Sequence, residues 1–229
     1  NTNWLDLMEQ DAIAQNHHLS FTGGGEKTNY AFSLGYLDQN GIIRNNYLKR
    51  LNVKLATDTK IKKWLKIGQT ITLTASEYKG TSENIEFSGK DDKRPSIYYQ
   101  SLLALRHIPP YEGTFEDGSP KWVLDIPHTD RALNPVFSAD RNFYISRDYL
   151  LNGVGYIQLE PVSGLVYKST FGYNLGFNEG DDFLPSYKVD ESYKQEFTEL
   201  YKIFQKTYSY NFDNTLTYSK EIGDHSFKF

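Results

Sequence analysis

The chain has 229 residues, enough for one large or two ordinary domains with a sizeable core. Its 25 Lys and Arg residues against 29 Asp and Glu residues give a net charge of -4, which gives no reason to expect a nucleic-acid-binding face. Because the chain has no Cys, disulfides and thiolate chemistry are excluded. The 18 Tyr and 14 Phe residues favour β-strands over helices.

Hydropathy excludes one kind of membrane protein. No apolar run approaches the ~18 residues that a membrane-spanning helix needs, and residues 1–20 lack the charged start and apolar middle of a signal peptide. The mean hydropathy of -0.60 is nevertheless compatible with a membrane β-barrel. The strands of such a barrel are apolar only at every second position, which keeps the mean hydropathy low.

The first predicted elements are a short helix or ordered loop in residues 1–16, then a β-hairpin in residues 17–41. One phase of the hairpin is apolar and contains Leu19, Phe21, Tyr30, Phe32, Leu34 and Tyr36. The other phase is small or polar and contains Ser20, Thr22, Ala31, Ser33 and Gly35. The "GGGEKT" sequence between them lacks the spacing of a phosphate-binding loop, so we interpret it as a turn in which Gly supplies positive φ.

Further alternating segments predict six more strands, at 47–59, 64–80, 148–160, 165–177 and 207–220 and at a start near Phe227. The segment 148–160 alternates less regularly, because Leu150 and Val154 fall in the opposite phase to Leu151 and Ile157. A β-bulge near Gly153 or Gly155 would place both sets on one face. These strands exceed the usual ~5 to 6 residues and match the ~9 to 11 of tilted membrane strands.

The connections alternate between short turns and two long loops, at 80–141 and 178–206. Short turns at one rim and long loops at the other are typical of outer-membrane barrels. In the first loop we expect a helix at 96–107, ended by Pro109 and Pro110. In the second we expect a helix after Asp190, with one apolar stripe formed by Phe197, Leu200, Tyr201 and Phe204.

The first long loop contains the candidate binding residues Tyr98, Tyr99, Tyr111, Phe115 and Trp122. Flat aromatic faces beside polar groups suit the capture of sugars or peptides. The alternative is that these rings form the small core of the loop itself. No Ser-His-Asp, Cys-His or carboxylate pair can be assembled, so we do not expect an enzyme, and we assign no catalytic residue.

A metal site is not expected either. The five histidines (His17, His18, His107, His128 and His225) lack helix-type ligand spacing, and there is no Cys partner. The acidic pairs Asp91–Asp92 and Asp181–Asp182 could bind Ca²⁺ together with loop oxygens, but such pairs are more often solvated. We therefore assign no metal and no cofactor.

Two fold classes account for the alternation: a soluble β-sandwich with one solvent-exposed face, and part of a larger membrane barrel. The polar phase is mostly Ser, Thr, Asn and Gly, and the apolar phase carries aromatic residues towards strand ends, as interfacial girdles do. A meander of long strands also has edges that a free-standing domain would have to protect. The sequence favours an all-β, antiparallel barrel segment.

The segment from Gln15 to Gly68 resembles the start of the barrel in TonB-dependent outer-membrane transporters of the SusC/RagA type. The resemblance rests on a Q-N-H segment, a strand ending in Gly-Gly, an E-K-T sequence, the G-Y-L-D-Q-N-G-I sequence at 35–42, a K-R strand and K-W-L-K-I-G at 63–68. "NPVF" from Asn134 and "EPVSGLVYKSTFGYN" from Glu160 resemble later barrel segments. The likeness therefore spans most of the chain.

The resemblance implies a fold and a partner beyond what composition indicates. It implies about eight strands of a barrel of about 22, with a plug domain and TonB-contacting segment before Asn1 and more strands after Phe229. Members of this type import glycans or peptides across the outer membrane of Gram-negative bacteria, with a SusD-like surface lipoprotein that closes over the barrel. The loops 80–141 and 178–206 would be extracellular and contact that lipoprotein or the substrate. A barrel that only scaffolds a surface complex is the alternative function.

Overall fold

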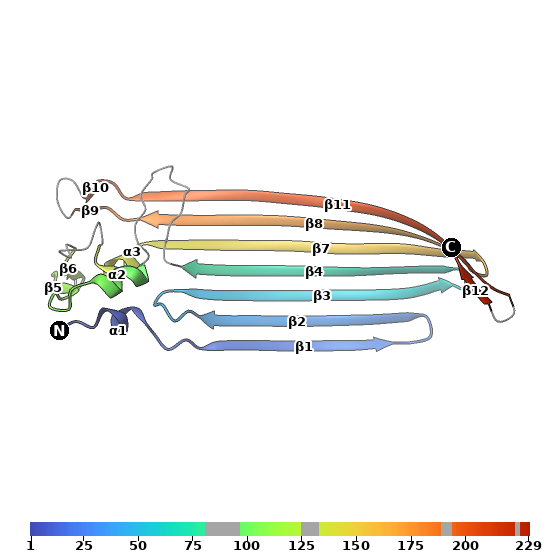
Figure 1. The fold of residues 1–229 in the computed structure, drawn as a ribbon, viewed down its shortest axis with the longest axis horizontal. Coiled ribbons are helices and arrows are strands. Elements are labelled where there is room, and N and C mark those ends of the chain that lie inside the picture. The colour runs from blue at the N-terminus through green and yellow to red at the C-terminus, as the bar shows by residue number, and fades with distance from the viewer. Residues whose placement is uncertain (81–96, 125–132, 189–193, 223–224) are drawn as a thin grey trace.

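The computed structural model describes residues 1–80, 97–124, 133–188, 194–222 and 225–229. Eight strands form one antiparallel sheet in the order β1-β2-β3-β4-β7-β8-β11-β12 (Figure 1). Their bounds are β1 Ala14–Gly24, β2 Thr28–Asn40, β3 Tyr47–Lys62, β4 Leu65–Gly80, β7 Phe143–Val162, β8 Leu165–Leu184, β11 Glu199–Ile222 and β12 His225–Lys228. The prediction of an eight-stranded antiparallel segment is confirmed.

Except for Leu150 and Val154 on β7, the sheet places the apolar phases of its strands on the same face. Residues paired across antiparallel strands share a face, and the pairs run through Phe21, Phe32, Leu55, Ile71 and Gly153 to Tyr173 and Tyr210. We call this the outward face. Phe21, Leu73 and Phe212 on it are 55%, 49% and 64% exposed, so among the described residues no second layer covers it. The sandwich alternative is therefore wrong, and the fold is a partial barrel.

The opposite face, which we call the inner face, carries the polar phase. Ser20 pairs with Ser33, and the Thr74 hydroxyl donates to Asn52 Oδ1 at 2.9 Å across neighbouring strands. An alternation of small polar and large apolar residues thus becomes two faces with opposite solvation. This is the arrangement of strands that face lipid on one side and a polar interior on the other.

The bulge expected near Gly153 or Gly155 is wrong. β7 keeps an uninterrupted register with β4 and with β8 through both glycines, and the shift in β7–β8 pairing falls between Leu159 and Val162. Leu151 and Ile157 therefore lie on the outward face, and Leu150 and Val154 on the inner face. The inner face tolerates these two apolar side chains, so no bulge is needed to turn them away.

The Gly-rich turn forms a hairpin as predicted, but positive φ is not the reason for its glycines. Among the described residues, the glycines with positive φ are Gly113, Gly118 and Gly164. Gly23 pairs instead with Tyr30, whose ring lies where a Cβ on Gly23 would be. At this position Gly allows an aromatic ring to lie against the backbone.

The second long loop is shorter than predicted. β8 continues to Leu184 and β11 begins at Glu199, so residues 179–184 pair with residues 199–204. Asp190, the expected N-cap, lies outside the described residues, but Leu200, Tyr201 and Phe204 belong to β11 and not to a helix. Pairing with β8 overrides the local helical spacing. Small strand pairs β9 Tyr187–Lys188 and β10 Lys194–Gln195 lie in the connection.

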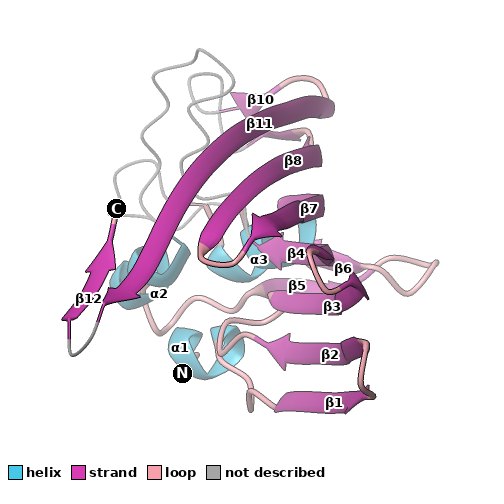
Figure 2. Ribbon diagram, turned by 90° about the vertical axis from the view of Figure 1, so that its right-hand side faces the viewer, coloured by secondary structure: helices cyan, strands magenta, loops and turns pink. Residues whose placement is uncertain are grey.

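The helices gather at the loop end of the sheet, opposite the short turns (Figure 1). They are α1 Trp4–Met8, α2 Ile97–Leu103 and α3 Pro135–Arg141, with a hairpin of β5 Tyr111–Thr114 and β6 Pro120–Trp122 between α2 and α3. In Figure 2, α1 and α2 lie to one side of the row of strands. α1 and α2 confirm predicted helices, although α2 is shorter than 96–107; α3 was not predicted. Within the described ranges, no helix is long and apolar enough to cross a membrane.

Candidate functional site

The loop end has the only hydrophobic clusters of fully buried residues in the described chain, and we call it the loop-end cluster. Trp4 and Met8 of α1 pack with Ile97 of α2 and Val136 of α3. Leu133, Phe137 and Tyr187 form a second group beside them. Segments more than 90 residues apart in sequence thus share one core, which fixes the loop residues relative to the sheet.

Asn134 organises this cluster. Its Oδ1 accepts hydrogen bonds from the Val136 and Phe137 N–H groups at 3.0 and 3.2 Å, which caps α3, and Pro135 occupies the first turn. Its Nδ2 donates to the carbonyls of Pro110 and Val123 at 2.6 and 2.9 Å. The side chain is fully buried, so one residue joins a helix start to both flanks of the β5–β6 hairpin. An Asn followed by Pro is the sequence signal that could have predicted α3.

The connection between β2 and β3 is tied to the same cluster. Arg44 forms an ion pair with Asp140 at 3.0 Å, and Asn45 Nδ2 donates to Asp140 Oδ1 at 3.0 Å and to the Ala139 carbonyl at 3.2 Å. Asn45 has a φ of 65°, in the left-handed region that Asn adopts more readily than most residues. This short loop therefore holds the C-terminal end of α3 against the sheet.

The five candidate binding residues separate into two groups. Trp122 packs against both hydrophobic groups, with its ring edge-on to Phe137 at a centroid distance of 5.8 Å and to Tyr111 at 6.2 Å. Trp122 is therefore part of the loop core, which was the alternative reading of these rings. The sequence could not separate the two roles, because both require an aromatic residue in the same loop.

The other four candidates lie at the surface. Tyr98 and Tyr99 on α2, Tyr111 on β5 and Phe115 after it are 42% to 54% exposed. Leu102 and Leu103 extend the apolar surface of α2, and Lys121 Nζ lies 5.0 Å from the Phe115 ring centroid. Among the described residues, no ring contact joins the α2 tyrosines to Tyr111 or Phe115. The structure thus offers two separate aromatic surfaces, one on α2 and one on the hairpin.

The turn of the β5–β6 hairpin is built by Asp117, Gly118 and Ser119. The Ser119 hydroxyl and N–H both donate to Asp117 Oδ1, at 2.6 and 2.9 Å, and they hold the pKa of that carboxyl below its usual value. Gly118 has a φ of 81°, which an L side chain rarely adopts. The turn holds Phe115 in a defined position on a solvent-exposed surface.

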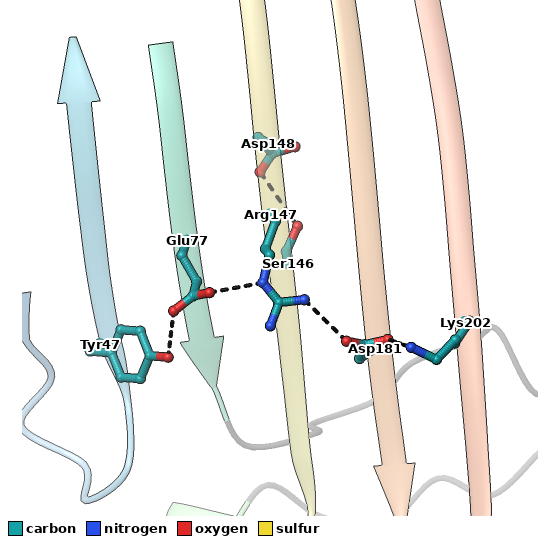
Figure 3. Close-up of polar contacts among 7 residues, drawn as sticks. All are labelled: Tyr47, Glu77, Ser146, Arg147, Asp148, Asp181 and Lys202. Carbon is teal, nitrogen blue, oxygen red and sulfur yellow. Dashed lines mark hydrogen bonds and ion pairs between the residues drawn. The ribbon is translucent and has the colours of Figure 1, made fainter.

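A chain of polar contacts crosses five strands near the loop end (Figure 3). The Tyr47 hydroxyl donates to Glu77 at 2.8 Å, and Arg147 donates through Nε to Glu77 at 2.8 Å and through Nη1 to Asp181 at 3.1 Å. Lys202 Nζ donates to Asp181 at 2.9 Å. The pairing register places all five side chains on the outward face. Sequence reasoning missed this chain, because it depends on which distant strands become neighbours.

The polar chain also bears on whether Asp181 and Asp182 could bind a cation together. Asp181 binds two cations of the protein itself, and Asp182 follows it in the same strand and so points to the other face. The two carboxylates do not form a shared cation site. Asp91, Asp92 and His128 lie outside the described residues. In the described part of the chain, no group of three or more His, Cys, Asp or Glu side chains could hold a metal ion.

The inner face has two shallow hollows that follow the strands. One, of about 220 Å³, is lined by polar side chains that include Thr72, Asn152 and Asn211. The other, of about 360 Å³, lies nearer the loop end and includes Asp148, Asn178 and Gln205. Asn178 Nδ2 donates to Asp148 and to Ser146 at 2.7 and 2.9 Å, so the second hollow has a fixed polar wall. Amide, hydroxyl and carboxylate groups thus line much of this route, together with the apolar side chains of Val154, Leu150 and Ile203.

No protein-family model matches the chain. The chain is 24% identical over 220 residues to TonB-dependent receptor P39 of Formosa agariphila, which covers 96% of this chain and 19% of the relative. It is 36% identical over 55 residues to TonB-dependent receptor SusC of Bacteroides thetaiotaomicron, which covers 24% of this chain. The chain spans about a fifth of the length of the receptors from Formosa agariphila that it matches.

Solved structures agree on the fold. The chain superposes with a TM-score of 0.74 on the RagAB peptide importer in its open-open state, at 24% identity, over 97% of this chain and 24% of that one. The closed-closed state of the same importer gives a TM-score of 0.71 at 22% identity. The fold of this chain therefore matches about a quarter of a longer chain.

Proposed function

We propose that the chain is a β-barrel segment of an outer-membrane TonB-dependent receptor of the SusC/RagA type, and that the whole protein imports a nutrient across the outer membrane. The proposal rests on the difference in polarity between the two faces of the sheet. Between the short turns and the polar chain the outward face is mostly apolar across seven strands, while the inner face carries mainly polar side chains. A wall of this kind separates lipid from a polar passage.

The loop end supports the proposed substrate class and partner. We assign the loop end, with residues 80–141 and the shortened connection 185–198, to the extracellular side, where a SusD-like lipoprotein would close over the barrel. Exposed aromatic side chains on α2 and on the β5–β6 hairpin supply flat apolar contacts at that opening. Glycans and peptides both present such faces beside hydrogen-bonding groups, and both fit this surface.

Import requires energy from the inner membrane, and this gives the first test. In the organism that carries the full-length gene, uptake of labelled oligosaccharide and oligopeptide pools is measured with TonB present and with TonB deleted. Import predicts that uptake of one pool depends on both the receptor gene and TonB. Uptake that is unchanged by deletion of the receptor gene would contradict the proposal, and a surface complex that assembles normally would then favour a scaffold.

The loop contacts have a separate test. Tyr98→Ala, Tyr99→Ala, Tyr111→Ala and Phe115→Ala, combined in the full-length protein, should weaken copurification of the surface lipoprotein or uptake without loss of assembled barrel. The matched control is Tyr208→Ala, which removes an exposed ring from the outward face of β11. Trp122→Ala is not suitable for this purpose, because it removes a core residue. Deletion of residues 90–130 is unsuitable for the same reason, because it would also remove Trp122 from the core.

A further inference from the structure

The polar chain on the outward face lies directly beyond the apolar belt of the sheet. On β4 the outward residues from Leu65 to Ala75 are mostly apolar, and the next one is Glu77. In register, Ala75, Tyr149 and Phe177 form one row, and Glu77, Arg147 and Glu179 form the next. The change from apolar to charged thus occurs at the same level on three neighbouring strands.

This level corresponds to the edge of the hydrocarbon layer. A tilted membrane strand crosses that layer in ~9 to 11 residues, which is the length of the apolar run on β4. Side chains that follow it on the outward face lie at the depth of the lipid headgroups, beyond a row that contains Tyr149 and Phe177. In the orientation proposed above, these are the headgroups of the outer leaflet.

We define the rim belt as Tyr47 and the charged outward side chains of β3, β4, β7, β8 and β11 in the two rows beyond Ala75, Tyr149 and Phe177, together with Lys206, which pairs in register with Phe177 in the last apolar row. They are Tyr47, Lys49, Glu77, Lys79, Arg147, Glu179, Asp181, Lys202 and Lys206. Five cationic groups face three carboxylates. Two of these carboxylates, Glu77 and Asp181, are already bound by Arg147 and Lys202. The ion-pair chain therefore neutralises most of the negative charge within the rim belt.

Three lysines of the rim belt remain without a carboxylate partner among the described residues. Lys49 lies over the Tyr47 ring and Lys79 over the Phe143 ring, each with 5.5 Å between Nζ and the centroid, and Lys206 lies 5.9 Å from the Phe177 centroid. The ammonium group of each of these lysines thus lies near the face of an aromatic ring. Lys49 pairs in register with Asp38 on β2 and with Glu77 on β4, and among the described residues it forms an ion pair with neither.

We propose that the rim belt binds the phosphate groups of an anionic glycolipid of the outer leaflet, through Lys49, Lys79 and Lys206. Neighbouring strands lie about 4.8 Å apart, so the lysines on β3, β4 and β11 span roughly 19 Å across the sheet. Arg147, held between two acids, keeps the centre of this surface rigid. The ligand lies against the outside of the barrel and takes no part in the inner passage.

The test uses the full-length protein in nanodiscs of phosphatidylcholine that contain a fixed fraction of purified lipopolysaccharide. Bound glycolipid per barrel is counted from 3-hydroxy fatty acids by mass spectrometry. Each lysine near an anionic membrane surface contributes a factor of about five, so the triple variant Lys49→Gln/Lys79→Gln/Lys206→Gln should bind on the order of 100-fold more weakly. The matched control, Lys54→Gln/Lys66→Gln/Lys168→Gln, removes the same charge from the inner face and should bind like the wild type.

Two further measurements keep the proposal open to refutation. Lipopolysaccharide stripped of its phosphates should bind the wild type as weakly as the intact lipid binds the triple variant. If the triple variant fails to assemble, the salt dependence of wild-type binding takes its place, since phosphate contacts weaken with ionic strength. Equal binding by the triple variant and its control, or of the stripped lipid and the intact one, would overturn the proposal. Neither result bears on TonB-dependent uptake, which tests the import function separately.

Discussion

Phe21 and Phe32 stack on the outward face of the β1–β2 hairpin, with 6.4 Å between their ring centroids, one step along the strand from the Ser20–Ser33 pair on the inner face. Phe32 and Ser33 therefore face different environments, although they are adjacent in the sequence. A substitution that inserts the same charge at each position separates the effects of the two faces.

We predict that Phe32→Asp impairs barrel assembly far more than Ser33→Asp. A charged side chain on the lipid face near the middle of the bilayer costs about 2 to 4 kcal/mol for Arg or Lys and less for a carboxylate, whereas the inner face already accepts polar groups. Assembly in the full-length protein is measured by the heat-dependent mobility of the folded barrel on a gel. Equal loss of folded barrel in both variants would contradict the assignment of faces.

Gly153 and Gly155 give a matched pair on β7. A Cβ on Gly153 would collide with the Tyr173 ring on β8, whereas a Cβ on Gly155 meets only the Gly68 carbonyl oxygen at 3.9 Å. Gly153→Ala should lower stability by about 1 to 2 kcal/mol, because the ring must leave its position, and Gly155→Ala should be close to neutral. Denaturant unfolding of the reconstituted full-length barrel compares the two.

The double variant Gly153→Ala/Tyr173→Leu provides the control for that experiment. Once the tyrosine ring is replaced by a shorter side chain, the alanine has room, so the double variant should be no less stable than Tyr173→Leu alone. An unchanged penalty for Gly153→Ala in the Tyr173→Leu background would place the strain elsewhere.

Asn134 has two separable roles, as cap of α3 and as donor to the hairpin. Asn134→Ala should destabilise the loop-end cluster by about 2 to 4 kcal/mol, since it removes the cap and leaves the Pro110 and Val123 carbonyls without their partner. The expected readout is faster hydrogen exchange in residues 97–124 and 133–142, with the exchange of β2 and β3 unchanged.

Asn134→Asp divides these roles. The aspartate keeps an oxygen for the Val136 and Phe137 N–H groups but points the other oxygen at two carbonyls. The start of α3 should therefore keep its protection from hydrogen exchange, whereas the hairpin should exchange faster than in the wild type. Uniform protection equal to that of the wild type would show that the two donated hydrogen bonds contribute nothing.

Substitutions at Asn45 test the contact between the β2–β3 loop and α3. Asn45→Ala should cost about 2 kcal/mol, since it combines the penalty for positive φ with loss of the hydrogen bonds to Asp140 and Ala139. Asn45→Gly should cost less, because Gly adopts the same φ freely and only the hydrogen bonds are lost. The two variants are compared by protease resistance of residues 133–142 in the folded barrel. Equal resistance would mean that φ is not a constraint here.

Much of this architecture was predictable from local sequence. In a strand, successive side chains point to opposite faces, so the alternation of residues such as Phe32 and Ser33 specified both the strand and its two environments. The lengths of the alternating runs indicated a membrane barrel, and the residues from Gln15 to Gly68 indicated its type. None of these inferences required knowledge of which strand pairs with which.

The tertiary structure decided whatever depends on long-range pairing. Leu200, Tyr201 and Phe204 have helical spacing, but pairing with β8 makes them part of a strand. Trp122 and Phe115 lie in the same loop, yet of the two only Trp122 packs against the buried residues of the loop-end cluster, because burial depends on distant partners. Arg147 meets Glu77 across 70 positions of sequence because β4 and β7 are neighbours. Alternation assigns a side chain to a face, but register alone determines which charge lies beside it.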